Sequence, residues 1–200
     1  MKLGLEIAIS TLMKQRIYKK AVDIVFNAKT QRIGVCNAAE SLLVHENIAS
    51  EVLPKLQEKL NEKDVLLKCD EISYGILKDQ LGRIEHATTE DWSMEYLDYV
   101  MSVKVVKDVE QAICHINTYS TKHSESIITE SKENAVRFLT KWILPVCIGM
   151  PLPVLPMAGC LASVRKIGIS TGKIHARGPM GLKEMTSYKY QIKGDGQIRS

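Results

Sequence analysis

Residues 35–69 read VCNAAESLLVHENIASEVLPKLQEKLNEKDVLLKC, and this stretch decides the fold. Val35–Val44 predicts a turn, a short helix and then a strand. Asn47–Asn61 predicts an amphipathic helix, because its apolar residues recur at helical spacing on one face. Val65–Cys69 predicts a further short strand. The apolar face of the helix holds Ile48, Val52, Leu53, Leu56 and Leu60.

The alternation of strands and helices continues on both sides of this stretch. Strands that alternate with helices are typical of an α/β layered domain. We therefore predict an α/β fold with a mostly parallel sheet flanked by helices. Ser131 is the expected N-cap of the last helix, with Glu133 in its first turn. The further expected elements are helices at Ala21–Asn27, Val109–Ile116 and Ser131–Thr140, strands at Val100–Val106 and Ser126–Thr129, and a hairpin or extended arm at Thr186–Arg199.

The composition is that of an ordinary soluble globular protein. The chain has 200 residues, of which 45% are hydrophobic and 25% charged, enough for one domain with a real core, or one domain and an appendage. The net charge of +4 is dispersed, whereas nucleic-acid binding calls for a clustered basic stripe. We expect no nucleic-acid partner.

The five cysteines, at positions 36, 69, 114, 147 and 160, form neither a CxxC pair nor a cluster with zinc spacing. We therefore expect no metal site. The odd count and the lack of a secretory signal predict free thiols in a reducing compartment, the cytoplasm. Cys69 and Cys114 have the pattern of ordinary structural residues, because a free cysteine in an apolar run is usually a small buried hydrophobe.

One stretch does not fit a soluble α/β domain. Trp142–Val164 carries no charged residue, and its length and apolarity alone are typical of a transmembrane segment. Prolines at positions 145, 151, 153 and 156 argue against a helix there, because each interior proline removes a hydrogen bond. We expect no membrane span, although a membrane-anchored or basic binding module is a third alternative that rests on this run and the net charge.

Four sequence blocks carry a resemblance to a known family. Together they cover about residues 19–141 and 166–200, and their order and spacing make the match specific. The chain resembles the C-terminal half of γ-glutamyl phosphate reductase, a branch of the aldehyde dehydrogenase superfamily. The blocks are NAKTQRIGVCNA at 27–38, Asp91-Trp92 with Glu95–Leu97 and Val103–Val106, HINTY at 115–119 with HSE at 123–125, and Ile167–Thr171 with HARGPMGL at 175–182.

Two stretches, residues 1–18 and 142–165, depart from the family altogether. Ile33 and Gly172 are smaller departures, since the family usually has proline and glutamine there. Reading the long stretches in a shifted frame restores family-like residues. Met and Trp each have a single codon, so the shifted residue is fixed where they occur, and it agrees with the family at each of these positions. We hypothesise a frameshifted gene, which also explains the uncharged, proline-rich run. Resequencing the DNA across codons 1–21 and 141–166 tests this.

The resemblance implies an aldehyde-dehydrogenase-like catalytic domain over 1–185 and a C-terminal arm over 186–200. It implies that Ser187–Lys193 leaves the domain and adds to a partner subunit, as in the superfamily's oligomers. The NADPH-binding half of the family precedes the region that this chain matches, and we find no GxGxxG-like phosphate loop here. Cofactor-binding residues are therefore not assigned, and NADPH is the cofactor that the resemblance implies.

The resemblance also implies the chemistry of Cys36. Its thiolate would attack L-glutamyl 5-phosphate, phosphate would leave, and NADPH would reduce the thioacyl intermediate to L-glutamate 5-semialdehyde in proline biosynthesis. A thiolate suits this role because it is strongly nucleophilic near neutral pH. The backbone amide of Cys36 or Asn37, near the start of an expected helix, would stabilise the oxyanion and lower the thiol pKa.

Four other residues are candidates for binding the anionic substrate. Lys29 and Arg32 precede the nucleophile, and such side chains favour phosphates and carboxylates, but a solvated basic turn explains them equally well. His175 and Arg177 belong to the fourth block, where a purely structural loop is the alternative. The competing function is an inactive, truncated remnant that keeps the fold and the oligomerisation arm without turnover.

Overall fold

A computed structural model describes residues 5–9, 15–35, 37–120, 124–141, 146–151 and 190–193. Its strands form one sheet in the order β4-β3-β5-β2-β1-β6-β7-β8, with every neighbouring pair parallel. The strands are β1 Leu5–Ile9, β2 Ala39–His45, β3 Leu66–Cys69, β4 Arg83–His86, β5 Val100–Val106, β6 Ser124–Thr129, β7 Val146–Pro151 and β8 Tyr190–Lys193.

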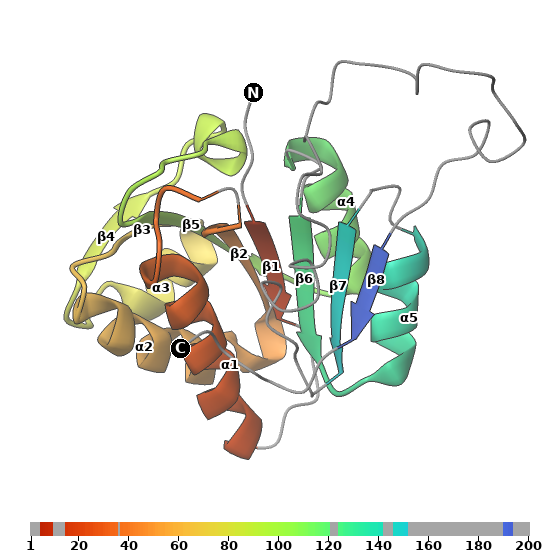
Figure 1. The fold of residues 1–200 in the computed structure, drawn as a ribbon. Coiled ribbons are helices and arrows are strands. Elements are labelled where there is room, and N and C mark those ends of the chain that lie inside the picture. Colours follow the sequence, from red (N-terminus) through yellow and green to blue (C-terminus); the bar gives the residue numbers. More distant parts are fainter. Residues whose placement is uncertain are drawn as a thin grey trace, which may run out of the picture.

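Helices cover both faces of this sheet (Figure 1). Parallel sheets need such cover, because each connection between parallel strands crosses one face. The first three helices pack on one face and the last two on the other. The helices are α1 Gln15–Thr30, α2 Glu46–Asn61, α3 Glu71–Leu77, α4 Val109–Tyr119 and α5 Lys132–Lys141, with a short 3-10 turn, η1, at Glu90–Ser93.

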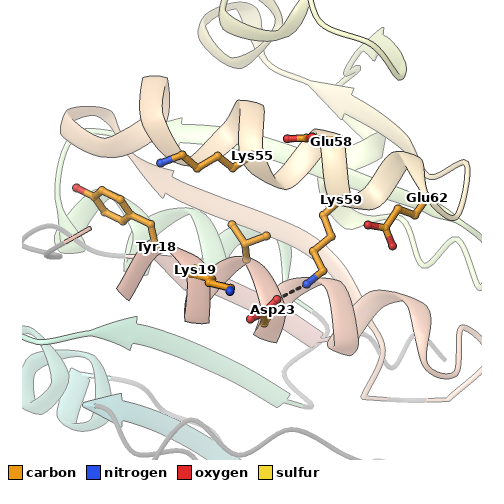
Figure 2. Close-up of a pocket in the computed structure, with 8 residues that line it drawn as sticks. Tyr18, Lys19, Asp23, Lys55, Glu58, Lys59 and Glu62 are labelled. Atoms are coloured by element: carbon orange, nitrogen blue, oxygen red, sulfur yellow. Dashed lines mark hydrogen bonds and ion pairs between the residues drawn. The ribbon is translucent and has the colours of Figure 1, made fainter. Parts of the chain in front are cut away.

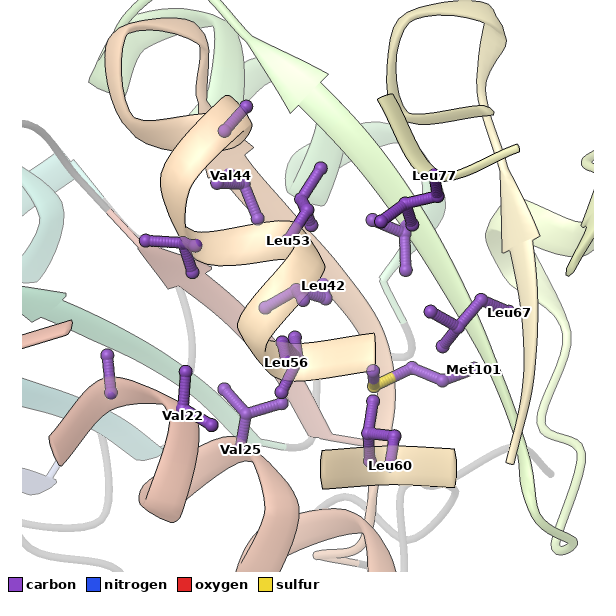
Figure 3. Packing of buried hydrophobic residues seen from close by; sticks show 14 of the residues in the cluster. Val22, Val25, Leu42, Val44, Leu53, Leu56, Leu60, Leu67, Leu77 and Met101 are labelled. Carbon is purple, nitrogen blue, oxygen red and sulfur yellow. The ribbon is translucent and has the colours of Figure 1, made fainter. Parts of the chain in front are cut away.

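The core is divided by the sheet into two clusters. Successive strand residues point to opposite faces, so Leu42 packs under α1 and α2 while Leu43 packs under α4. The larger cluster surrounds the buried face of α2 (Figure 3). There Leu56 and Leu60 are fully buried, in agreement with the helical face predicted from the sequence.

Most predicted elements are confirmed, several with small changes of length. Helix α1 extends the predicted Ala21–Asn27 at both ends, and β5 has the predicted bounds. Ser131 precedes α5, and its Oγ accepts a hydrogen bond from the backbone N–H of Asn134 at 3.2 Å, as an N-cap does. The α/β fold with a parallel sheet flanked by helices is therefore confirmed.

Two expectations are wrong. Residues 37–45 hold no helix, because all of β2 is buried and pairs with β1 on one side and β5 on the other. A backbone used in two ladders has no groups left for helical hydrogen bonds. Tyr190–Lys193 does not leave the domain but pairs with β7 and forms the edge strand of the sheet.

The sequence analysis missed β7 and η1 and three further elements. Strand β1 lies at the centre of the sheet although it belongs to the stretch 1–18 that departs from the family. Strand β4 is a short edge strand whose residues are mostly exposed, so it has no apolar alternation to detect. Helix α3 is capped by Asp70, whose side chain accepts from the backbone N–H of Ser73 at 2.9 Å.

Candidate active site

Three of the four family-like blocks meet at the amino-terminal edge of the sheet. The loop residues 31–35 and 37–38 immediately precede β2, the segment 87–99 precedes β5, and α4 ends shortly before β6. Because β2, β5 and β6 run in the same direction, these connections lie along one edge, the upper one in Figure 1. Ligands in open α/β sheets usually bind at the carboxyl edge, so this fold places its candidate site at the opposite one.

The six predicted site residues divide into two groups. Cys36, His175 and Arg177 lie outside the described residues, so their roles stay predictions. The other three are described. Arg32 is exposed in the loop, and Asn37, two residues before the start of β2, is half-buried. Lys29 is fully buried in the last turn of α1.

Lys29 forms a buried ion pair with Glu40, the second residue of β2. The Nζ–Oε2 distance is 3.1 Å, and the two side chains are 0% and 5% exposed. Burial lowers the pKa of Lys29 and raises that of Glu40, and the attraction between the two partly opposes both shifts. Both charged groups of the pair have therefore lost most of their hydration.

Glu40 also holds the segment before β5. Its Oε2 accepts a hydrogen bond from the backbone N–H of Tyr96 at 3.3 Å, and the N–H of Leu97 contributes a second. Leu97 adopts a left-handed conformation with φ of 52°. A non-glycine residue pays roughly 1–2 kcal/mol for this conformation. Such strain persists only where the surroundings enforce it, here where the turn aims two amides toward one carboxylate.

The Tyr96 side chain continues this network to Asp91. Its hydroxyl donates to Asp91 Oδ1 at 2.9 Å, and the backbone N–H of Thr88 donates to Asp91 Oδ2 at 2.7 Å. Burial alone would raise the pKa of Asp91, but these hydrogen bonds outweigh it and hold the pKa below its usual value. Burial and the neighbouring carboxylate raise the pKa of Tyr96, which therefore stays a donor.

An aromatic cluster links the second and third blocks. Trp92 of η1 meets the ring of His115 edge-on, with centroids 5.5 Å apart, and His115 lies 4.7 Å from the ring of Tyr119. Lys104 lies over Trp92 at 5.0 Å. Burial and then the charge of Lys104 lower the pKa of His115 to about 4. His115 is therefore neutral near pH 7 and gives no positive charge for an anionic substrate.

Sequence reasoning missed Glu40 and Tyr96 as members of this edge. A signal was present for Glu40, because it is a lone charge within the apolar run Ala38–Val44, and a buried charge needs a partner. Tyr96 is marked only by its place in the second block, between Glu95 and Leu97. Its role depends on a backbone amide that only the folded chain brings to β2.

Other features of the described residues carry no catalytic pattern. Cys69 is buried with its pKa raised to about 11, as expected of a small buried hydrophobe, whereas Cys114 is exposed and departs from that expectation. No group of three His, Cys, Asp or Glu in the described ranges is arranged to hold a metal ion. Within the same ranges, every helix is too short or too polar to cross a lipid bilayer.

A surface groove between α1 and α2 has a volume of about 440 Å³ (Figure 2). Its lining carries basic and acidic side chains side by side, including an ion pair between Lys59 and Asp23. None of the lining residues belongs to the loop 31–38 or to the segment 87–99. The groove is therefore distinct from the edge at which the sequence blocks meet.

Comparisons with known proteins agree with the resemblance seen in the sequence. No family model matches the chain. A γ-glutamyl phosphate reductase of Agathobacter rectalis is 51% identical over 93% of this chain, which covers 44% of that protein. The crystal structure of a γ-glutamyl phosphate reductase from Thermotoga maritima superposes with a TM-score of 0.74 at 40% identity, over 100% of this chain and 47% of that one.

A more distant comparison bears on the fold alone. The crystal structure of betaine aldehyde dehydrogenase from Staphylococcus aureus, solved in complex with NAD+, has a TM-score of 0.53 at 14% identity. It matches 74% of this chain and 37% of its own. The fold is thus that of aldehyde dehydrogenases. The chain spans less than half the length of the curated relatives it matches.

Proposed function

We propose that this relative of the γ-glutamyl phosphate reductases, which spans less than half of their length, carries the acyl-accepting thiol of their reaction at Cys36. The observation that carries the proposal is the convergence of the family-like blocks on one edge of the sheet. Residues 31–35 and 37–38, which flank Cys36 in the sequence, lie there, and Glu40 and Tyr96 connect the start of β2 to the second block.

The proposed reaction begins with attack of the Cys36 thiolate on the acyl carbon of L-glutamyl 5-phosphate. A C–S bond forms, the bond between the acyl carbon and the phosphate oxygen breaks, and phosphate leaves with the electron pair. The backbone N–H of Cys36 or Asn37 is our candidate donor to the oxyanion that develops during this attack. Lys29 is committed to Glu40, which leaves Arg32 as the exposed cation nearest in sequence to the thiol for an anionic substrate.

In the whole enzyme, a nicotinamide cofactor supplies hydride that converts the thioester into L-glutamate 5-semialdehyde and frees the thiolate. We propose NADPH as that cofactor in the cytoplasmic, homo-oligomeric parent enzyme. The residues described here do not fit such a cofactor: no described strand is followed by a glycine-rich phosphate turn, and the described glycines, Gly34, Gly75, Gly82 and Gly149, are isolated. We therefore derive no hydride step for this chain.

The competing proposal is an inactive remnant that keeps the fold. It is supported by the poor fit of the described residues to a cofactor. The two proposals predict different properties for the isolated chain. Acyl transfer to Cys36 needs only the thiol and its edge, whereas turnover needs the cofactor as well. We expect the chain to accept an acyl group without completing the reaction.

The test is acylation followed by peptide mass spectrometry. The protein is incubated with acetyl phosphate as a stable acyl phosphate, and each cysteine-containing peptide is quantified. We expect acetyl thioester on Cys36, none after Cys36→Ser, and unchanged labelling after the matched Cys114→Ser. Equal labelling of Cys36 and the exposed Cys114 would contradict the proposal. Phosphate-dependent reduction of NADP+ with glutamate semialdehyde, measured alongside, is expected to stay at background, and activity there would refute the remnant.

A further inference from the structure

The loop that carries Cys36 is bounded by two residues that bind each other. Helix α1 ends at Thr30 and β2 begins at Ala39, so Lys29 and Glu40 stand just outside the two ends of the loop. Their ion pair at 3.1 Å closes the loop across its base. The loop itself adds a short backbone contact, from the N–H of Ala38 to the carbonyl of Val35 at 2.9 Å.

Stability alone is a poor explanation for this pair. Both charges are desolvated, and this shifts the pKa of Lys29 down and that of Glu40 up in spite of their mutual attraction. Apolar residues of similar volume usually stabilise such a position as well or better. A buried ion pair in an otherwise apolar core is more readily explained by the geometry that it imposes, because charge and hydrogen bonding are directional where apolar contacts are not.

A second contact ties the same carboxylate to the segment before β5. Glu40 accepts the backbone N–H groups of Tyr96 and Leu97, and Leu97 adopts its left-handed conformation at this point. One carboxylate therefore joins the end of α1, the start of β2 and the segment 87–99. Asp98 is the further charged group that acts on Lys29.

We infer that Lys29 and Glu40 are positioning residues, which hold the base of the Cys36 loop against the segment 87–99 so that the thiol keeps its reactive placement. This inference rests on the proposed role of Cys36. It gives Lys29 a different role from substrate binding, because its ammonium group is fully buried against Glu40. The pair acts on the reaction only through the loop.

The experiment measures the alkylation rate of each cysteine peptide with iodoacetamide between pH 5 and 10. The key variant is Lys29→Met with Glu40→Leu, which removes both charges together and so keeps the core free of an unpaired one. The control variant is Asp23→Asn with Lys59→Met, which removes an ion pair from the same helix at the α1–α2 groove (Figure 2). Protection of the buried Cys69 reports that each variant is folded.

No helix follows Cys36 to lower its pKa. In the unaltered chain and in the control, we expect Cys36 to titrate below the value of about 8.5 of a free thiol because of the loop placement that we infer. In the key variant, its profile should move toward that value, and alkylation near neutral pH should fall roughly tenfold for each pH unit by which the thiol pKa rises. An unchanged Cys36 profile in the key variant, with Cys69 protected, would overturn the positioning role alone. A free-thiol profile in every variant would instead overturn the nucleophile proposal and the positioning role with it.

Exposed Cys69 in the key variant would mean that the fold is lost. The single variant Glu40→Gln then tests the inference, because the glutamine side chain keeps an acceptor for the amides of Tyr96 and Leu97 and a partner for Lys29. If holding the loop is the role of this position, Glu40→Gln should keep the Cys36 profile within about twofold of the unaltered rate at neutral pH. A profile moved to the free-thiol value in Glu40→Gln with Cys69 protected would count against the inference.

Discussion

Replacing Lys29 alone with methionine should destabilise the fold far more than replacing both members of the ion pair. In Lys29→Met, the Glu40 carboxylate stays in the interior at 5% exposure and keeps backbone N–H donors as partners. Its second oxygen, Oε1, is buried and has no hydrogen-bond partner even in the unaltered chain. Removing one partner of a buried ion pair costs about 3–5 kcal/mol. That is a large part of the roughly 5–15 kcal/mol typical of a whole domain.

The double variant with Met at 29 and Leu at 40 supplies the comparison. Replacing a buried pair with apolar residues is often neutral or stabilising, but Leu at 40 also removes the acceptor of the Tyr96 and Leu97 amides. We therefore expect the free energy of unfolding of the double variant to lie no more than about 1–3 kcal/mol below that of the unaltered chain, and above that of Lys29→Met. Urea unfolding followed by circular dichroism measures the free energy of unfolding of the unaltered chain, both single variants and the double variant. The resulting cycle should give a coupling of about 3 kcal/mol or more between Lys29 and Glu40.

The loss in free energy of unfolding caused by Lys29→Met should also depend on pH. Burial raises the folded-state pKa of Glu40 above its ordinary value of 4.5. The protonated Glu40 carboxyl therefore contributes stability below pH 4.5, and this contribution is lost as the pH rises through the folded-state pKa. Lys29 opposes this shift, so its removal raises the pKa of Glu40 further and enlarges the loss. The deficit should therefore be small near pH 4 and grow toward pH 7. A pH-independent deficit below about 1 kcal/mol would refute a desolvated pair at this position.

Three further outcomes follow from the described core. In the native chain, iodoacetamide should label the exposed Cys114 readily and spare Cys69, whose pKa burial raises to about 11, and rapid labelling of Cys69 below the unfolding transition would contradict its burial. Leu56→Ala on the buried face of α2 should lower the free energy of unfolding by about 2–5 kcal/mol in urea titrations. Gly82→Ala should cost at least about 1 kcal/mol by the same measurement, because Gly82 has a φ of 135° and an added Cβ would meet the Gln57 side chain at 3.0 Å.

The sequence by itself determined which segments are buried and which motif carries the thiol. Apolar periodicity located α2 and β5, because the spacing of buried side chains along one element depends only on that element's geometry. The block around Cys36 could be assigned from its residues, since a specific run of side chains identifies a family without any knowledge of contacts. The short β4 escaped because an exposed edge strand has no such pattern.

Only the tertiary structure decided which segments meet. Strand order depends on pairing between residues far apart in the chain, which periodicity does not encode, so neither the central place of β1 nor the pairing of β8 with β7 could be foreseen. The same holds for Glu40, whose partners come from α1 and from the segment before β5. A charge in an apolar strand announces that it needs a partner, but only the folded chain shows which residues provide one.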